Sequence, residues 1–257
     1  MLRPMPGTLP LRQYDLVIAD IDGCLVSETT APFDLESLAT VRRYNELALE
    51  RGDRPIVTLC SGRPQPFAES ICRLIGNTTM PCVCEMGVWT YHPGTNRYEM
   101  DPAITPSHLR AVGELSAWAA SEFGGIGVTQ QPGKNASVTL WHPDTRRLRE
   151  EIFPAVEKRI RESGWPFRVS MTWYYINCDL AHVSKGSGID RLLKMTGLSR
   201  ARLAGIGDTT GDKCIAERVA FFACPSNAQA GIKEHAHYIA SKPEAEGVVE
   251  ILERLIG

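Results

Sequence analysis

The sequence predicts an α/β protein in which a parallel sheet is covered by helices on both faces and interrupted by an inserted α+β module. Short apolar runs alternate with segments of helical periodicity up to residue 87, and the same alternation returns after residue 183. Such alternation implies parallel strands with both faces covered. Hairpin signals occupy the stretch between. We therefore expect a core domain from residues 1–87 and 183–257, and an inserted α+β domain from residues 88–182.

The first part of the core contains clear strand and helix signals. Asp34 stands where an N-cap is expected, apolar residues follow at helical intervals, and Gly52 marks the end of that helix. Strands are expected at residues 14–20, 54–60 and 80–85, and helices at residues 34–52 and 65–76.

The middle of the chain combines hairpins with two long helices. Pro154 falls inside the second helical pattern and is expected to kink it or to mark its true start. Trp141, Trp165 and Trp173 are interpreted as packing residues of this module. Strands are expected at residues 88–93, 97–100, 126–131, 136–142, 167–172 and 174–180, and helices at residues 107–124 and 144–164.

The last part of the chain returns to alternating strands and helices. Strands are expected at residues 201–207, 219–224 and 237–240, and helices at residues 186–197 and 244–257, with two further helices between the strands.

Composition limits the function classes. The 257 residues carry a net charge of -2 without a long basic block, which argues against nucleic acid as a partner. No apolar run reaches the length of a membrane span, and the N-terminus lacks a signal-peptide core, so a cytoplasmic location is expected. The eight cysteines show no paired CxxC spacing and are interpreted as reduced, mostly buried thiols.

Polar clusters follow several predicted strands. In a parallel sheet, ligands bind beyond the carboxyl ends of the strands, so these clusters are expected to converge if the strands are neighbours. They are Asp20-x-Asp22-Gly23 after the first strand, Ser61-Gly62-Arg63 after the second, Asp208 to Asp212 after a later one, and Lys185 before a helix.

Such a group of acids indicates a cation and a phosphate. Carboxylate oxygens suit Mg²⁺, whereas the Ser61 hydroxyl, the backbone near Gly62 and the Lys185 ammonium provide donors for phosphate oxygens. In this chemistry Asp20 attacks phosphorus and Asp22 acts as general acid and then base.

Four segments in this order, "DIDGCL", "LCSGR", "SKG" and "GDTTGD", resemble the motifs of the haloacid dehalogenase superfamily. The insertion between the second and third segments resembles the type IIB cap of its sucrose-phosphate, mannosyl-phosphoglycerate and phosphoglycolate phosphatases. The resemblance implies a Rossmann-like core, with Asp20 as nucleophile and Ser61 and Lys185 as phosphate ligands. Mg²⁺ would be held by Asp20, the Asp22 backbone carbonyl and Asp208, with Asp212 supporting the site.

Several other candidate residues have more than one possible role. Gly62, Arg63 and Asn227 are candidate phosphate or substrate contacts, although Arg63 is equally compatible with a surface ion pair. Asp212 is alternatively an N-cap. Lys134 and Asn135 at a hairpin tip are either substrate contacts or a solvated turn, and Glu85 is a candidate only by its position in the motif.

Three residues depart from the family pattern. Cys24 replaces a threonine, Met86 an asparagine of "ENG", and Gly211 an asparagine. None of them is one of the groups expected to carry the reaction.

The sequence therefore predicts a Mg²⁺-dependent phosphatase for a small phosphorylated metabolite, either a sugar phosphate or a phospho-acid. Two alternatives remain: a phosphosugar mutase, and a catalytically idle phosphometabolite-binding protein on the same fold. The sequence indicates neither the physiological substrate nor the oligomeric state.

Overall fold

A five-stranded parallel sheet forms the centre of the core. The computed structural model describes residues 12–172 and 174–256. The strand order is β12-β11-β10-β1-β2, and every neighbouring pair is parallel, which confirms the predicted α/β class. The strands are β1 (Leu16–Ala19), β2 (Ile56–Leu59), β10 (Leu203–Ile206), β11 (Phe221–Cys224) and β12 (Tyr238–Ile239).

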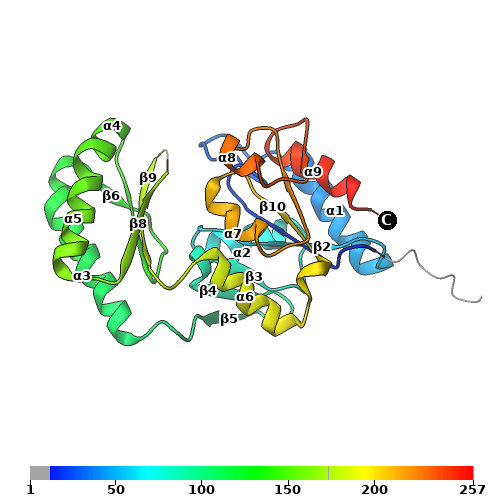
Figure 1. Cartoon of the computed structure of the whole chain (residues 1–257), viewed down its shortest axis with the longest axis horizontal. Helices are drawn as coiled ribbons and strands as arrows, with labels where there is room; N and C mark the ends of the chain where they lie inside the picture. The colour runs from blue at the N-terminus through cyan, green and yellow to red at the C-terminus, as the bar shows by residue number, and fades with distance from the viewer. Residues whose placement is uncertain (1–11, 173, 257) are drawn as a thin grey trace, which may run out of the picture.

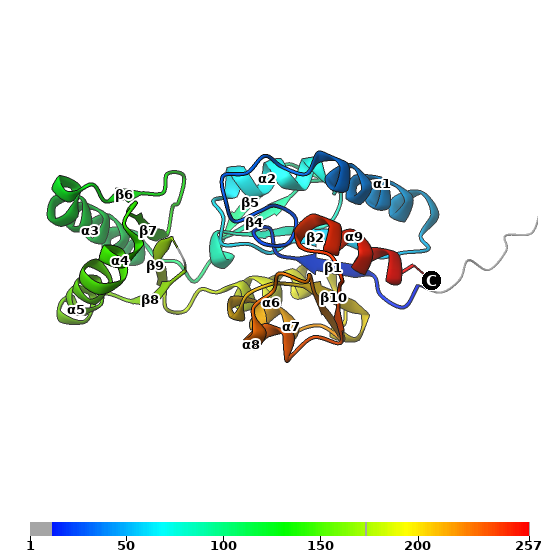
Figure 2. The same ribbon diagram turned by 90° about the horizontal axis from the view of Figure 1, so that it is seen from above.

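Helices cover both faces of this sheet. Helices α1, α2 and α9 pack on one face, and α6, α7 and α8 lie on the other (Figure 2). The predicted caps of α1 are present, because the Asp34 side chain accepts a hydrogen bond from the Ser37 amide and Gly52 adopts a left-handed conformation with φ 68°. The helices are α1 (Leu35–Arg51), α2 (Gln65–Leu74), α6 (Lys185–Thr196), α7 (Lys213–Ala216), α8 (Ala230–Lys233) and α9 (Glu244–Arg254).

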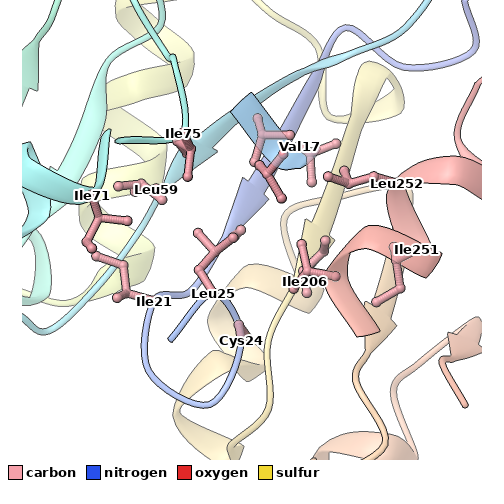
Figure 3. Packing of buried hydrophobic residues seen from close by; sticks show 14 of the residues in the cluster. Val17, Ile21, Cys24, Leu25, Leu59, Ile71, Ile75, Ile206, Ile251 and Leu252 are labelled. Atoms are coloured by element: carbon pink, nitrogen blue, oxygen red, sulfur yellow. The ribbon is translucent and has the colours of Figure 1, made fainter. Parts of the chain in front are cut away.

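The apolar core continues past the end of β1 into the turn that follows it. Figure 3 shows Val17 of β1 beside residues of the neighbouring strands, with Ile21, Cys24 and Leu25 in the same cluster. Ile21 and Leu25 are fully buried, and burial of each such side chain contributes about 1.5–3 kcal/mol. This packing fixes the backbone of the turn from which the acids at the end of β1 project.

A small antiparallel sheet extends the core beside β2. It comprises β3 (Cys82–Cys84), β4 (Trp89–His92) and β5 (Arg97–Met100). β3 contacts the parallel sheet through one bridge between Cys60 and Val83, whereas it pairs along its length with β4. β4 and β5 therefore lie with the core (Figure 1). The domain boundary at residue 88 stays a prediction, and we propose that the chain leaves the core after β5 instead.

The second body, here called the insert, spans residues 106–180. Its sheet has the order β6-β7-β9-β8 and is antiparallel throughout. Pro154 lies in the first turn of α5, where its missing N–H is not needed, and a π-helical turn at Leu148–Ile152 joins α4 to α5. The elements are α3 (Pro106–Phe123), β6 (Thr129–Gln130), β7 (Ser137–Trp141), α4 (Thr145–Arg147), α5 (Phe153–Ser163), β8 (Phe167–Met171) and β9 (Tyr175–Leu180).

The two faces of the insert's sheet differ in chemistry. Leu140 of β7 packs with Ile176 and Cys178 of β9 against α3 and α5. Successive side chains of a strand point to opposite faces of the sheet, so the residues between these apolar ones point away from the helices. The sheet lies between these helices and the core (Figure 1), so the alternate, polar residues face the core. Trp165 packs at the edge of the insert's apolar cluster, and Trp173 lies outside the described residues.

Cysteine usage agrees with the prediction. All eight cysteines are free thiols, and only Cys214 is partly exposed. None of the described helices combines the length and apolar character that a membrane crossing requires.

Glu85, at the end of β3, joins the core to the insert. Its Oε1 accepts hydrogen bonds from the backbone amides of Asn135 and Ala136, both at 2.8 Å, and from the Ser137 hydroxyl at 3.1 Å. The carboxylate is completely buried and its Oε2 has no partner among the described residues. Burial raises the pKa of Glu85, against the opposing effect of these hydrogen bonds.

Replacing Glu85 by alanine is expected to lower the free energy of unfolding by about 1–3 kcal/mol, since the Asn135 and Ala136 amides and the Ser137 hydroxyl lose their acceptor. Glu85→Gln keeps an acceptor oxygen and should lose less than half as much. Urea unfolding measures both, and hydrogen exchange should show faster exchange at the Asn135 and Ala136 amides in the alanine variant. Equal losses in the two variants would contradict this role of the acceptor.

Candidate active site

The polar clusters predicted at the strand ends converge. β1 is hydrogen-bonded to β2 on one side and to β10 on the other. Asp20 directly follows β1, Ser61 lies two residues after β2, and Asp208 lies two residues after β10. Their side chains therefore meet at the carboxyl edge of the sheet, where open α/β sheets bind ligands.

Lys185 sits between two of the acids. Its Nζ donates to Asp20 Oδ2 at 2.7 Å and to Asp212 Oδ1 at 2.6 Å. Lys185 is the first residue of α6, and a capping box between Ser184 and Ser187 fixes that helix end. Burial alone would lower the pKa of Lys185, but the two carboxylates raise it above its usual value. The ammonium therefore stays charged in this buried position.

Asp212 organises the loop after β10. Its Oδ2 accepts hydrogen bonds from the backbone amides of Asp208 and Thr209, each at 3.1 Å. Gly207 has to be glycine, because a Cβ there would lie 2.4 Å from the Asp212 Cβ. Both carboxylate oxygens of Asp212 are thus engaged by the protein. It orients Lys185 and the loop, rather than merely capping α7.

The acid cluster is short of positive charge. Carboxylate oxygens of Asp20, Asp208 and Asp212 lie within 4.8 Å of one another. Burial and the neighbouring Asp212 carboxylate raise the pKa of Asp20 to about 7, despite Lys185. Burial and the Asp20 carboxylate raise the pKa of Asp208 to about 9. One ammonium does not balance three buried acids, so the cluster fits a divalent cation with a preference for oxygen ligands.

Asp208 fits this cation best. Among the described residues, its carboxylate receives one hydrogen bond, a long one of 4.0 Å from the Cys24 thiol. The turn at Gly23, with φ +69°, brings the backbone so close that a Cβ would lie 2.0 Å from Asp208 Oδ2. The sequence thus places a buried, poorly partnered carboxylate directly against the turn that carries Asp22.

Asp22 is paired with Arg63. The Arg63 guanidinium contacts both carboxylate oxygens of Asp22 at 2.5–2.9 Å, a two-pronged geometry that fixes the orientation of the acid. Arg63 also lies over the Phe67 ring, 4.8 Å from its centroid. Asp22 and Arg63 both line the cavity described below. Arg63 therefore forms an ion pair, the alternative left open by the sequence, within the site rather than on a remote surface.

A cavity of about 210 Å³ lies between the core and the insert. The core contributes Asp20, Asp22, Ser61, Gly62, Arg63 and Lys185 to its lining. Ser61 is fully buried and its Oγ accepts a hydrogen bond from the Arg63 amide at 3.1 Å, so this hydroxyl is fixed at the cavity wall. The insert contributes Gln131, Lys134, Ser170, Thr172, Tyr174, Tyr175, Asn177 and Asp179.

Two candidate residues do not line the cavity. Asn227 donates from Nδ2 to the Gly23 carbonyl at 2.9 Å, and its Oδ1 accepts from the Glu244 amide. The predicted substrate contact of Asn227 is therefore not found, because its amide is used to brace the turn after β1. Asn135 accepts a hydrogen bond from the Trp89 indole, whereas Lys134 lines the cavity.

Sequence reasoning missed the polar residues that the insert contributes. Tyr175, Asn177 and Asp179 alternate along β9 with the apolar residues that pack on the helices. This period of two was visible in the sequence and would have marked one polar face. Which way that face points depends on the placement of the insert against the core, and no local pattern contains that information.

The chain is similar to several known proteins along most of its length. The sequence pattern of the haloacid dehalogenase-like hydrolase family matches residues 131–252. A phosphoglycolate phosphatase from Methanospirillum hungatei is 27% identical over 236 residues, covering 92% of this chain and 94% of the relative. One from Sulfolobus acidocaldarius is 24% identical, covering 94% and 96%.

Solved structures share the fold. A haloacid dehalogenase-like hydrolase from Bacteroides thetaiotaomicron has a TM-score of 0.71 at 18% identity, covering 94% of this chain and 99% of that one. The sucrose-phosphatase from Synechocystis, in complex with sucrose and phosphate, has a TM-score of 0.67 at 18% identity, covering 95% and 98%.

The fold, the buried acid cluster and these matches agree with the resemblance to the haloacid dehalogenase superfamily that the four motifs predicted. The same matches support a phosphatase activity on a phosphorylated substrate.

Proposed function

We propose that this protein is a Mg²⁺-dependent phosphatase that hydrolyses a small phosphorylated metabolite through an aspartyl-phosphate intermediate. The observation that supports it best is the placement of Asp20 and Lys185 in one cavity with Ser61 and Asp22. The phosphoglycolate phosphatases and the sucrose-phosphatase to which the chain is similar suggest two substrate classes, a phospho-acid and a sugar phosphate.

In the first step an Asp20 oxygen attacks phosphorus while the bond from phosphorus to the ester oxygen breaks. The leaving alkoxide takes a proton from Asp22. Ser61 and Lys185 donate hydrogen bonds to the phosphoryl oxygens and so hold the group in line with Asp20. Since Arg63 pairs with the Asp22 carboxylate in the structure, Asp22 has to exchange this partner for the ester oxygen before it can act as an acid.

In the second step Asp22 removes a proton from a water molecule, whose oxygen attacks phosphorus. The bond from phosphorus to Asp20 breaks, inorganic phosphate leaves, and the Asp20 carboxylate is restored. Asp212 does not react in this scheme. It keeps Lys185 beside Asp20 through the contact of 2.6 Å.

Asp20, the Asp22 carbonyl and Asp208 would hold Mg²⁺, with Asp212 in support. When bound, the ion supplies positive charge to the phosphoryl oxygens and offsets repulsion between carboxylate and phosphate. The raised pKa values of Asp20 and Asp208 support this assignment, because they show how strongly the cluster favours added positive charge.

Mg²⁺ is expected to stabilise the protein more at pH 8 than at pH 5. Asp20 and Asp208 have folded pKa values of about 7 and about 9, above their ordinary 3.8. Protonation therefore stabilises the folded state, and after EDTA treatment this stability is lost as the pH rises through those values. A cation can replace these protons. At 100 times its Kd, Mg²⁺ should add about 2.7 kcal/mol.

Thermal unfolding with EDTA and with Mg²⁺ at both pH values measures this difference. Asp208→Asn is the matched variant and should show a smaller Mg²⁺ effect at pH 8. A Tm increase that is the same at both pH values, or larger at pH 5, would argue against the cluster as the metal site.

The activity test is release of inorganic phosphate from a panel of phosphate esters, with Mg²⁺ and with EDTA, beside Asp20→Asn. Release that needs the metal and is lost in the variant would support the proposal. Isomerisation of a sugar phosphate without release would favour a mutase. Binding of esters without any turnover would favour a binding protein.

A further inference from the structure

The polar face of the insert's sheet forms the far wall of the cavity. Cross-strand register places Thr139 of β7 and Ser170 of β8 on either side of Asn177 on β9, and Ser137 and Arg168 on either side of Asp179. Six residues of β8 and β9 and the loop between them line the same cavity as Asp20 and Lys185: Ser170, Thr172, Tyr174, Tyr175, Asn177 and Asp179. A substrate held at Asp20 by its phosphoryl group would present its alcohol portion to this face.

Asp179 carries an oxygen on this face that has no hydrogen-bond partner among the described residues. Its side chain is buried, with 3% of the residue exposed, and its Oδ1 accepts no hydrogen bond from the described residues. Its Oδ2 lies 3.9 Å from Arg168 Nη2. Burial raises the pKa of Asp179, while Lys134 and Arg168 oppose that rise. A buried acceptor without a donor is costly and indicates a missing partner.

Lys134 provides the complementary donor. Its Nζ donates to Thr139 Oγ1 at 2.7 Å, and Thr139 Oγ1 in turn donates to Asn177 Oδ1 at 2.9 Å. This is the one hydrogen bond that the ammonium makes with the described residues, so further N–H donors remain for a ligand. Burial lowers the pKa of Lys134, and the negative charges of Asp179 and Glu85 oppose that effect.

We infer that Lys134 and Asp179 form a specificity site that binds free hydroxyl groups on the alcohol part of the phosphate ester. The enzyme therefore favours sugar or polyol phosphates over phospho-acids. A hydroxyl group can donate to Asp179 and accept from Lys134. A carboxylate can only accept, and it would bring a second negative charge beside the unpartnered oxygen of Asp179. This inference rests on the proposed function and selects between its two substrate classes.

The test compares kcat/KM for glycerol 3-phosphate and glucose 6-phosphate with that for phosphoglycolate, in the wild type and in Asp179→Asn. Phenyl phosphate carries neither a hydroxyl nor a carboxylate and reports the chemistry alone. The wild type should prefer the better hydroxyl-bearing ester. In Asp179→Asn that ester should lose about 10- to 100-fold, whereas phosphoglycolate should be hydrolysed faster and phenyl phosphate should change little.

Further variants separate specificity from damage to the insert. Lys134→Met should raise KM for the hydroxyl-bearing esters with a smaller change in kcat. Glu157→Gln, an exposed residue of α5, should leave every value unchanged.

Two outcomes would overturn the inference while leaving the proposed function intact. One is a wild-type preference for phosphoglycolate, and the other is a loss by the same factor for all esters in Asp179→Asn. Absence of Mg²⁺-dependent release from every ester, phenyl phosphate included, would overturn the proposed function and this inference with it.

Discussion

Replacing Asp20 by asparagine is expected to lower phosphate release by at least about 10⁴-fold, the order seen when a nucleophile is removed. An amide oxygen is a poor nucleophile, so the covalent step cannot proceed. Stability should survive the change. Burial and Asp212 disfavour the Asp20 charge, and a neutral side chain of the same shape relieves that cost. Unfolding in EDTA at pH 8 should therefore give a free energy equal to or above that of the wild type.

Asp15→Asn is the matched control. Asp15 precedes the same strand at its other end and pairs with Arg12 and Arg202, so the substitution should cost at most about 1 kcal/mol of stability and leave activity within about twofold. Rapid acid quench of the wild type, followed by mass spectrometry, should find a phosphorylated peptide containing residue 20. Release that persists in Asp20→Asn, or a phosphopeptide elsewhere in the chain, would remove Asp20 from the nucleophile's role.

The parallel core and its acid cluster were predictable because both depend on short-range patterns. Apolar runs of strand length alternating with capped helices imply parallel pairing, and Asp20 and Asp208 each interrupt such a run at its carboxyl end. The only further requirement was that β10 and β2 flank β1, which the structure confirms. The sequence therefore contained the position of the cluster without any knowledge of side-chain geometry.

The remaining features depend on contacts between distant segments. The run at residues 82–84 has the same apolar character as a parallel strand, yet β3 pairs mainly with β4, because a short apolar run does not specify its partner. Glu85 accepts hydrogen bonds from backbone amides about fifty residues away along the chain. Arg63 pairs with Asp22, and Asn227 donates a hydrogen bond to the turn after β1. Both contacts depend on side-chain rotamers, which are selected by packing between elements that are distant in the sequence.

Replacing Lys185 by methionine is expected to lower the free energy of unfolding by about 3–5 kcal/mol at pH 8, the cost of leaving buried charges without their partner. The ammonium is buried, with 5% of the residue exposed, and bridges Asp20 and Asp212. Without it, the carboxylates retain only one another and the loop amides. The loss should be smaller at pH 5, since Asp20 has a pKa of about 7 even beside the lysine and is protonated there.

Urea unfolding at the two pH values in EDTA measures this effect, and Lys213→Met is the matched control. Lys213 is exposed and adjacent to Asp212, so its replacement should change stability by no more than about 0.5 kcal/mol. If uncompensated charge is the cause, adding Asp212→Asn to Lys185→Met should recover part of the loss, because one of the repelling carboxylates is gone. A Lys185→Met variant as stable as Lys213→Met, or one whose loss is independent of pH, would show that the ammonium does not hold the acid cluster together. The carboxylates would then need another source of positive charge in the folded protein.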